Sequence, residues 1–392
     1  MILTAKYGLP VDVRFCKRCV ISNQRPNSTI EHANHADVPK QTINFDAEGV
    51  CDACRVAEAK ETIDWKERER ELLDLLTQHR STGAYDCVVP GSGGKDSFYA
   101  AHVLKTKYGM HPLLVTWAAH LYTDVGWRNL QRWQGIADHI LVTPSTNTHR
   151  LLTRLATENL FHPFQPFVIG QKNMAPKLAD LYGIKLVFYG ENEAEYGNSR
   201  ADAASPVRDA RYHTGNDIYL GGASLGELSR RFDLSRGDLA PYLPENRTSA
   251  DVRYLGYYLK WHPQSAYYYA VENGGFECAP ERSPGTYSKY NSIDDKVDDL
   301  HYWTTYIKFG IGRATYDAAQ EIRSGEITRE EGVSLVKRYD GEYPARFERE
   351  LLEYLSVSGF PKMTRESLMD LAESFKSPHL WDGDRHRHGV WN

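Results

Sequence analysis

Long apolar runs are missing from this sequence, and no stretch approaches the roughly 20 residues that a membrane span needs. The first six residues, Met-Ile-Leu-Thr-Ala-Lys, also lack the long apolar segment of a secretory signal. Positive charge is not in excess, because 47 Lys and Arg residues stand against 52 Asp and Glu residues, for a net charge of −5. A broad nucleic-acid footprint usually needs a basic face. These absences predict a cytoplasmic protein with no membrane span and no nucleic-acid partner.

Cysteine is scarce as well, and four of the six cysteines form two close pairs, Cys16/Cys19 and Cys51/Cys54. Each Cys-x-x-Cys pair places two thiolates on one tight turn, and two such turns complete a tetrahedral zinc site. In a cytosolic chain this spacing favours zinc over disulfides. Four thiolates leave no open coordination position, so the predicted Zn²⁺ is structural.

The most informative stretch runs from Tyr85 to Ser97, where an apolar run meets three glycines and two serines, followed by a helical pattern. A strand, a glycine-rich loop and a helix in this order aim backbone N–H groups and the positive helix end at one point, where an anion binds. A Walker A loop would need glycine at Val89 and Ser or Thr at Asp96, and a Rossmann loop would need a small residue at Asp96. Both spacings fail. The loop therefore predicts another type of anion site, with an ordinary glycine-rich turn as the alternative.

Strand and helix patterns alternate from this loop onward. Strand-like runs lie at 85–90, 112–116, 139–142 and 185–189, and helical patterns lie at 97–108, 127–137, 148–159 and 173–182. Such alternation predicts an α/β fold with a doubly wound parallel sheet, to which the run 251–261 would add a fifth strand. Ahead of the sheet, residues 56–80 are predicted to form one amphipathic helix. Ligands of such a sheet bind at the carboxyl ends of its strands.

One of these strand ends is rich in carboxylates. The run 185–189 leads directly into Gly190-Glu-Asn-Glu-Ala-Glu-Tyr-Gly197. Carboxylates this close together are costly unless a cation or a donor-rich ligand binds there. Glu191 and Glu195 are therefore predicted to bind a cofactor, with Glu193 the weaker candidate, and the alternative is a solvated acidic loop.

The helical pattern 302–322 in the second half contains two glycines, Gly310 and Gly312. Glycines inside a helical run usually mark a break or a close backbone approach. Lys308 and Arg313 flank them, and a contact with a phosphate is predicted for both, the alternative being two surface cations at a helix break.

Two other C-terminal segments lead to expectations. Segment 285–296 is dense in hydroxyls, acids and lysines, so it is either a wall for a sugar or a polar surface loop. The tail around His386 and His388 is predicted to be a disordered terminus rather than a metal site.

The string Ser92-Gly-Gly-Lys-Asp-Ser97 resembles the pyrophosphate loop of the ATP pyrophosphatase superfamily, whose members cleave ATP between the α and β phosphates. The resemblance implies that the loop binds the leaving pyrophosphate and that Asp96 helps to bind Mg²⁺. The implied nucleotide-binding residues are Ser92, Gly93, Gly94, Lys95, Asp96 and Ser97, joined by Glu191 and Glu195. The implied catalytic residues are Lys95, Asp96, Lys308 and Arg313.

Over almost its whole length, the chain resembles the N-acetyl sugar amidotransferases, a branch of that superfamily associated with lipopolysaccharide and with pseudaminic or legionaminic acid pathways. The resemblance rests on both cysteine pairs and on segments 91–97, 190–197, 254–261, 287–296, 306–315, 322–331 and 339–342. It implies a sheet of the adenine nucleotide alpha hydrolase-like, pyrophosphate-loop type. An N-terminal zinc-knuckle module and a helical C-terminal region would flank this sheet.

The resemblance also implies a reaction, in which ATP and ammonia convert the acetamido group of an N-acetyl sugar, nucleotide-linked or a nonulosonic acid, into an acetamidino group. The chain shows no glutaminase signature of its own, because Cys87 lies in a buried strand and Cys278 in a Glu-Cys-Ala-Pro context. The implied partner is therefore a separate glutaminase subunit, with a cyclase-like barrel as a candidate conduit for the ammonia.

These observations divide the chain into a zinc-binding module (1–60), a linker helix (61–84), an ATP-binding domain (85–262) and a mainly helical substrate or partner region (263–392). Two other functions compete. A tRNA thiolation enzyme shares the loop, but it would need a reactive or cluster-binding cysteine at the active site and a basic surface. A non-catalytic nucleotide-binding scaffold would not need Asp96 or the acidic run at 191–195.

Overall fold

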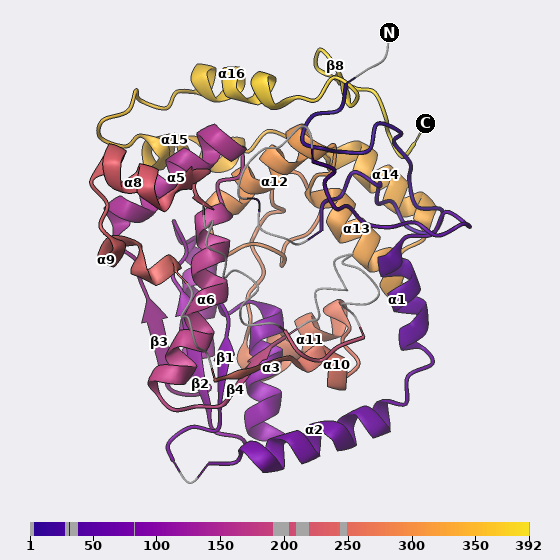
Figure 1. Ribbon diagram of the computed structural model, residues 1–392. Coiled ribbons are helices and arrows are strands. Elements are labelled where there is room, and N and C mark those ends of the chain that lie inside the picture. The colour runs from indigo at the N-terminus through magenta and orange to yellow at the C-terminus, as the bar shows by residue number, and fades with distance from the viewer. Residues whose placement is uncertain are drawn as a thin grey trace.

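In the computed structural model, strands from residues 87–254 form a five-stranded parallel sheet (Figure 1). The structure describes residues 4–27, 31, 38–81, 83–190, 204–208, 219–243 and 249–391. The strands, in the order β3-β2-β1-β4-β7 across the sheet, are β3 (His139–Val142), β2 (Pro112–Trp117), β1 (Cys87–Pro90), β4 (Leu186–Tyr189) and β7 (Asp251–Tyr254). Every neighbouring pair is parallel. The predicted doubly wound α/β sheet is confirmed.

Helices cover both faces of this sheet. The first face carries α2 (Trp65–His79), α3 (Lys95–Thr106), α4 (Asp124–Gln134) and α11 (Pro263–Gly274), and the second carries α5 (Thr146–Leu160) and α6 (Gln165–Leu181). Because side chains alternate along a strand, Cys87 and Val89 enter the first core and Val88 enters the second. All of β1 and β2 is buried, as expected for strands covered on both sides.

The C-terminal helices form a further layer beside the sheet, at the top and right of Figure 1. They are α12 (Val297–Phe309), α13 (Arg313–Ser324), α14 (Arg329–Tyr339), α15 (Glu348–Leu355) and α16 (Arg365–Phe375). One apolar core joins α12, α15 and α16, and another joins α13 and α14 to the four paired cysteines. The predicted helical C-terminal region is confirmed.

Small elements complete the described chain. They are the two-residue strand pairs β5 (Tyr219–Leu220) with β6 (Ala223–Ser224) and β8 (Trp381–Asp382) with β9 (Arg385–His386), and the short helices α8 (Leu225–Phe232), α9 (Arg236–Leu239), η2 (Ala240–Tyr242), α10 (Leu255–Tyr258) and η3 (Ala345–Phe347). Among the described residues, no helix combines the length and the apolar character that a membrane crossing requires.

Three expectations for individual elements were wrong in part. The single helix predicted at 56–80 is two helices, α1 (Asp52–Lys60) and α2, because the Asp64 side chain accepts hydrogen bonds from the first N–H groups of α2 and starts it anew. Helix α6 begins eight residues earlier than predicted, at Gln165. The fifth strand ends at Tyr254, and α10 follows directly.

The C-terminal tail is ordered, contrary to the prediction of a disordered terminus. Trp381 Nε1 donates a hydrogen bond to the Ile307 carbonyl oxygen at 2.8 Å, and a ring nitrogen of His379 lies 3.0 Å from Gln24 Oε1. The Trp381 ring is buried against Tyr306 of α12. These contacts fix the tail between the N-terminal segment and α12.

Candidate functional site

The glycine-rich loop joins β1 to α3 at the carboxyl edge of the sheet. Gly94 is the N-cap of α3, and no side chain of the cap occupies the first N–H groups of the helix. Gly93 has φ of +85°, and a Cβ there would lie 2.7 Å from Leu130 Cα, so only glycine fits. The loop thus presents helix N–H groups and the positive end of the α3 dipole, which together favour an anion.

Polar side chains of the loop lie at the start of α3. Lys95 Nζ lies 2.5 Å from Asp96 Oδ2, and the Ser97 hydroxyl donates to the Gly94 carbonyl oxygen at 3.0 Å. The Lys95 side chain is 7% exposed and that of Asp96 is 26% exposed. The structure therefore brings the predicted loop residues Ser92 to Ser97 together, while their roles toward a nucleotide remain predictions.

The strand β4 ends beside this loop. Its direct successor, Gly190, is a neighbour of the loop, because a Cβ on it would lie 3.5 Å from the Asp96 carbonyl oxygen, in van der Waals contact. The loop and Gly190 occupy the point where the strand order reverses, which is where open α/β sheets bind ligands. The predicted Glu191 and Glu195, with the weaker candidate Glu193, lie outside the described residues.

The segment before α12 brings a further carboxylate, Asp294, to the loop. The Ser92 side chain lies close to the Asp294 carboxyl group and lowers its pKa. The N–H of Thr123 donates to the Asp294 carbonyl oxygen at 3.1 Å, and a Cβ on Gly126 would lie only 2.4 Å from Asp294 Cα. The sequence offered Asp294 only as part of the polar segment 285–296, because nothing local marks one carboxylate in it as a neighbour of the loop.

The adjacent residue, Asp295, anchors this segment to the chain after β2. Its Oδ2 lies 2.6 Å from His120 Nδ1 and accepts the His120 N–H at 2.7 Å, and its Oδ1 accepts the Leu121 N–H at 3.2 Å. Both the His120 and the Asp295 side chains are buried. The position of Asp294 is therefore fixed by its neighbour.

Two carboxyl groups near the loop have raised pKa values. Burial raises the pKa of Asp294, and the nearby Ser92 side chain opposes this effect only in part. Burial also raises the pKa of Asp298 well above its usual value, and the charges of Asp294 and Asp295 add to the effect. Arg313 lowers both pKa values, which places its charge within electrostatic reach of Asp294 and Asp298.

Arg313, at the start of α13, is held in a network of its own. Its guanidinium group lies 3.0 Å from Asp317 Oδ1, donates to the Ser292 hydroxyl at 2.8 Å and stands 4.4 Å from the centre of the Tyr302 ring. Arg313 is thus fixed beside the segment that carries Asp294. Its predicted contact with a phosphate remains a prediction.

Lys308, the other predicted phosphate contact, lies on the buried side of α12. Its ammonium group donates to Glu31 Oε2 at 2.8 Å and to the Leu160 carbonyl oxygen at 2.7 Å. Lys40 Nζ lies 2.7 Å from the other oxygen of Glu31. Burial would raise the pKa of Glu31, but the charges of Lys308 and Lys40 outweigh it and lower that pKa to about 2. Sequence analysis missed Glu31, because it lies 277 positions from Lys308.

A cavity of about 350 Å³ lies between the N-terminal segment and the helices α5, α6, α12 and α13. Glu31 and Lys40 line it from the N-terminal side, and Arg313 and Asp317 line it from α13. The predicted loop residues are not among its lining residues in the described part of the chain.

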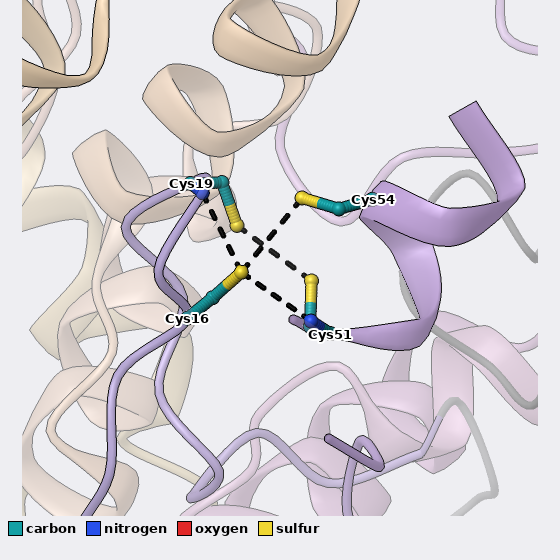
Figure 2. Close-up of side chains that lie close together, drawn as sticks. All are labelled: Cys16, Cys19, Cys51 and Cys54. Carbon is teal, nitrogen blue, oxygen red and sulfur yellow. Dashed lines mark hydrogen bonds between the residues drawn. The ribbon is translucent and has the colours of Figure 1, made fainter. Parts of the chain in front are cut away.

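The four paired cysteines meet in a buried cluster (Figure 2). All four Sγ atoms lie within 4.8 Å of one another, with Cys16 to Cys54 at 3.8 Å and Cys19 to Cys51 at 3.7 Å. A tetrahedral zinc site with Zn–S bonds of about 2.3 Å has S–S edges of about 3.8 Å. The N–H of Cys51 also points at Cys16 Sγ, at 3.3 Å, a contact that favours a thiolate. The predicted metal ligands are therefore brought together in a geometry that fits Zn²⁺.

The two remaining cysteines differ from each other. Cys87 is buried in β1, and burial raises the pKa of its thiol. Cys278 is exposed after the end of α11. Neither lies on a strand-to-helix turn of the nucleophile-elbow type.

A family model matches the C-terminal part of the chain, 109 of its 392 residues. Residues 284–392 match the family model described as the C-terminal domain of WbpG-like LPS biosynthesis proteins. An uncharacterized protein of Methanocaldococcus jannaschii is 30% identical over 82 residues, which are 21% of this chain and 29% of that protein. The chain thus matches less than a third of the length of this relative.

Two solved structures are similar over most of this chain. NMN synthetase from Francisella tularensis has 12% identity and a TM-score of 0.30, over 76% of this chain and 99% of its own. The U34-tRNA thiolase NcsA from Methanococcus maripaludis, solved with its 4Fe-4S cluster, has 13% identity and a TM-score of 0.31, over 88% and 97%. Such scores describe a weak overall superposition.

The family match agrees with the predicted link to lipopolysaccharide biosynthesis. The matched residues begin ten positions before Asp294. The matched stretch, residues 284–392, contains Asp294, Asp298 and Arg313.

Proposed function

We propose that the chain is an ATP-dependent N-acetyl sugar amidotransferase, which converts an acetamido group into an acetamidino group and releases AMP and pyrophosphate. One observation supports the proposal: Asp294 lies in the stretch that matches the WbpG-like LPS biosynthesis model, and it is close enough to Ser92 of the glycine-rich loop for the Ser92 side chain to lower its pKa. We infer that this matched stretch and the glycine-rich loop contribute to one site.

The first step in this reaction activates the amide. The amide oxygen attacks the α-phosphorus of ATP, the bond from that phosphorus to the bridging oxygen breaks, and pyrophosphate leaves with the electron pair. The proposal assigns the binding of the leaving pyrophosphate to Ser92, Lys95, Ser97 and the first N–H groups of α3, which carry no side-chain cap. Because little covalent chemistry falls to the protein, rate acceleration comes from holding the amide in line and neutralising charge.

The second step replaces oxygen by nitrogen. Ammonia adds to the carbon of the O-adenylyl imidate, the bond from that carbon to oxygen breaks, and AMP leaves with the former amide oxygen. The amidine takes up a proton and becomes a cation. Arg313 is proposed to contact a phosphate in this sequence. For Lys308, whose ammonium group binds Glu31, we propose a positioning role toward Glu31 instead.

Two metal ions are part of the proposal. Asp96, with Glu191 and Glu195, would hold Mg²⁺, which neutralises charge on the phosphates when it is bound. Cys16, Cys19, Cys51 and Cys54 would hold a structural Zn²⁺, which ties the two cysteine turns together when it is bound. Neither ion takes part in bond making at carbon.

Ammonia is proposed to come from a separate glutaminase subunit. Cys87 is buried and Cys278 follows a helix end, so neither has the setting of a glutaminase nucleophile. Purified chain should therefore turn over with ATP, acceptor sugar and ammonium but not with glutamine alone. Turnover on glutamine alone would remove the partner from the proposal.

The function itself is tested by product analysis. The purified chain is incubated with ATP, Mg²⁺, ammonium and a panel of acetamido sugars, and mass spectrometry then detects a sugar in which one oxygen is replaced by NH. AMP should form in equal amount. Asp96→Asn should lower the rate by at least about 100-fold, as expected when a preorganised charge is removed from the reacting phosphates. Asp74→Asn, at an exposed position on α2, is the matched control and should keep wild-type activity.

Two outcomes would contradict this function. AMP release that depends on added tRNA and leaves every acetamido sugar unchanged would favour a thiolation enzyme. An Asp96→Asn variant with full activity would remove the loop from catalysis.

A further inference from the structure

The turn 339–342, at the end of α14, has no role in the reaction described above. Its sequence is Tyr-Asp-Gly-Glu. Gly341 has φ of +83°, and a Cβ there would lie 2.3 Å from a carbon of the Tyr306 ring on α12, so only glycine fits. The turn is therefore packed against α12, and the carboxylates of Asp340 and Glu342 stand on either side of the glycine in the sequence.

Asp340 binds the first turn of α13 from outside that helix. Its two carboxylate oxygens accept the N–H groups of Gly312 and Thr315, each at 3.1 Å. These N–H groups have no acceptor within the helix, because they lie at its start. Arg313 is the first residue of α13, so Asp340 fixes the backbone that carries the Arg313 guanidinium group.

Glu342 binds the segment 285–296 at its first residue. Its carboxylate accepts the N–H of Gly285 at 2.9 Å, and the guanidinium group of Arg282 donates to its two oxygens at 2.5 and 2.9 Å. The Gly285 carbonyl oxygen in turn accepts the N–H of Ala314, in the first turn of α13, at 2.9 Å. Gly285 therefore joins Glu342 to the start of α13.

The segment 285–296 is bound to α13 at two further points. Asp317 of α13 accepts the Thr286 hydroxyl at 2.6 Å and also pairs with Arg313 at 3.0 Å. Arg313 itself donates to the Ser292 hydroxyl of the segment at 2.8 Å. The segment and the start of α13 are therefore held as one unit, to which the turn 339–342 contributes a carboxylate on each side.

Two side chains of this unit are parts of the site at the glycine-rich loop. Arg313 is carried by the helix start that Asp340 binds. Asp294 is carried by the segment that Glu342 binds, and it lies close to Ser92 of the loop. A misplacement of about 1 Å, even one caused far from the reacting atoms, can lower a rate roughly 100-fold. The turn is thus placed to affect the reaction without contacting a substrate.

We propose that the turn 339–342 is a positioning element of the reaction, which sets the places of Arg313 and Asp294 at the glycine-rich loop. Glu342 is a positioning residue, because it acts through the N–H of Gly285. The inference rests on the proposed amidotransferase function for the reaction that is affected, whereas the linkage of the two segments can be measured without turnover.

Variants of Glu342 in the full-length protein test the positioning role. Glu342→Ala removes the acceptor of the Gly285 N–H and should lower kcat for amidine formation at least tenfold, with the Kd of a non-hydrolysable ATP analogue within threefold of wild type. Glu342→Gln keeps one acceptor oxygen for that N–H and should restore kcat to within threefold of wild type. Glu281→Ala removes the same charge from an exposed residue beside Arg282 and should leave kcat unchanged.

Hydrogen exchange of the same variants measures the linkage directly. In Glu342→Ala, the amides of 285–296 and those of 312–316 should both exchange at least fivefold faster than in wild type. The amides of β1 should keep their wild-type rates, because the sheet core is untouched. Exchange that accelerates equally in β1 would indicate global destabilisation and would overturn the positioning role.

The outcomes separate this inference from the proposed function. If wild-type protein forms no amidine while Glu342→Ala shows the expected exchange pattern, the linkage is supported and the reaction is contradicted. Amidine formation by Glu342→Ala at the wild-type kcat would support the reaction and overturn the positioning role. A loss in Glu342→Gln as large as that in Glu342→Ala would also overturn it, because the bond to the Gly285 N–H would then not matter.

Discussion

At the residue scale, Glu31 shows how a single charge is held inside this protein. Its side chain is 10% exposed, and each carboxylate oxygen has a lysine partner at 2.7 or 2.8 Å. Removing one partner of such a buried pair leaves an uncompensated charge, which costs roughly 3–5 kcal/mol. Glu31 therefore couples the N-terminal segment to α12 through Lys308.

The pKa of Glu31 leads to a pH prediction. Because the folded-state pKa, about 2, lies below the usual value of 4.5, the contribution of this carboxylate to stability is full above pH 4.5 and disappears as the pH falls through 2. Glu31→Gln should lower the free energy of unfolding at pH 7, and the difference from wild type should shrink steadily below pH 4.5. Urea unfolding at a series of pH values measures this difference.

Glu366→Gln is the control for that series, because Glu366 is exposed on α16. It should show no such pH-dependent difference. A Glu31→Gln effect that stays constant from pH 7 to pH 3 would contradict the depressed pKa.

Residues of the site divide according to how far apart their partners lie in the sequence. The cluster of the paired cysteines was predictable, because a separation of three positions within each pair indicates it. The glycine-rich loop could also be located from its spacing, whereas the roles of Ser92 to Ser97 remain predictions. Asp294 and Glu31 were not predictable, because their partners Ser92 and Lys308 lie about 200 and 277 positions away. No local pattern encodes such a contact, since only the tertiary fold creates it.

At the element scale, α13 starts with a cap that comes from another helix. Its N-cap, Gly312, has no capping side chain, and a Cβ there would lie 2.7 Å from Asp340 Oδ1. Asp340, at the end of α14, accepts the N–H groups of Gly312 and Thr315, each at 3.1 Å. The glycine pair was predicted to mark a break or a close approach, and it does both. Gly310 ends α12 with φ of +67°, and Gly312 is the glycine that Asp340 approaches closely. The sequence did not identify Asp340 as the residue that approaches.

This cap gives the element-scale prediction. Asp340→Ala should lower the free energy of unfolding by about 1–3 kcal/mol, because two buried N–H groups lose their acceptor. Asp340→Asn keeps an acceptor oxygen and should lose clearly less. Thermal and urea unfolding of both variants measure the difference, and equal losses would contradict the cap.

At the scale of the whole molecule, the four-cysteine module is continuous with the C-terminal helices. Its cysteines share one apolar core with Ile311, Ala318, Ala319 and Val336 of the α13–α14 region. The sheet order and the helical C-terminal layer followed from strand and helix patterns, whereas this packing of the first 54 residues against the last hundred did not. The domain boundaries at 60, 84 and 262 remain predictions.

Removal of one cysteine thiol should therefore destabilise α13. Cys51→Ser should lower the zinc content to a small fraction of the wild-type value and reduce the melting temperature, with a loss of 2 kcal/mol corresponding to roughly 4–8 °C. Hydrogen exchange in α13 should accelerate with it. Cys278→Ser, at the exposed cysteine, should change none of these quantities. Full melting temperature in a zinc-free wild-type protein would refute a structural metal.

The distance in sequence between Ser92 and Asp294 also affects when this site can form during translation. The ribosome adds about 5–20 residues per second, so the roughly 200 residues between them take about 10–40 s to synthesise. During that interval the nascent chain already contains its glycine-rich loop, but Asp294, the carboxylate that lies beside the loop in the folded protein, has not yet been synthesised. A growing chain thus cannot assemble this site until most of the protein has been translated, and synthesis itself sets the order in which its parts come together.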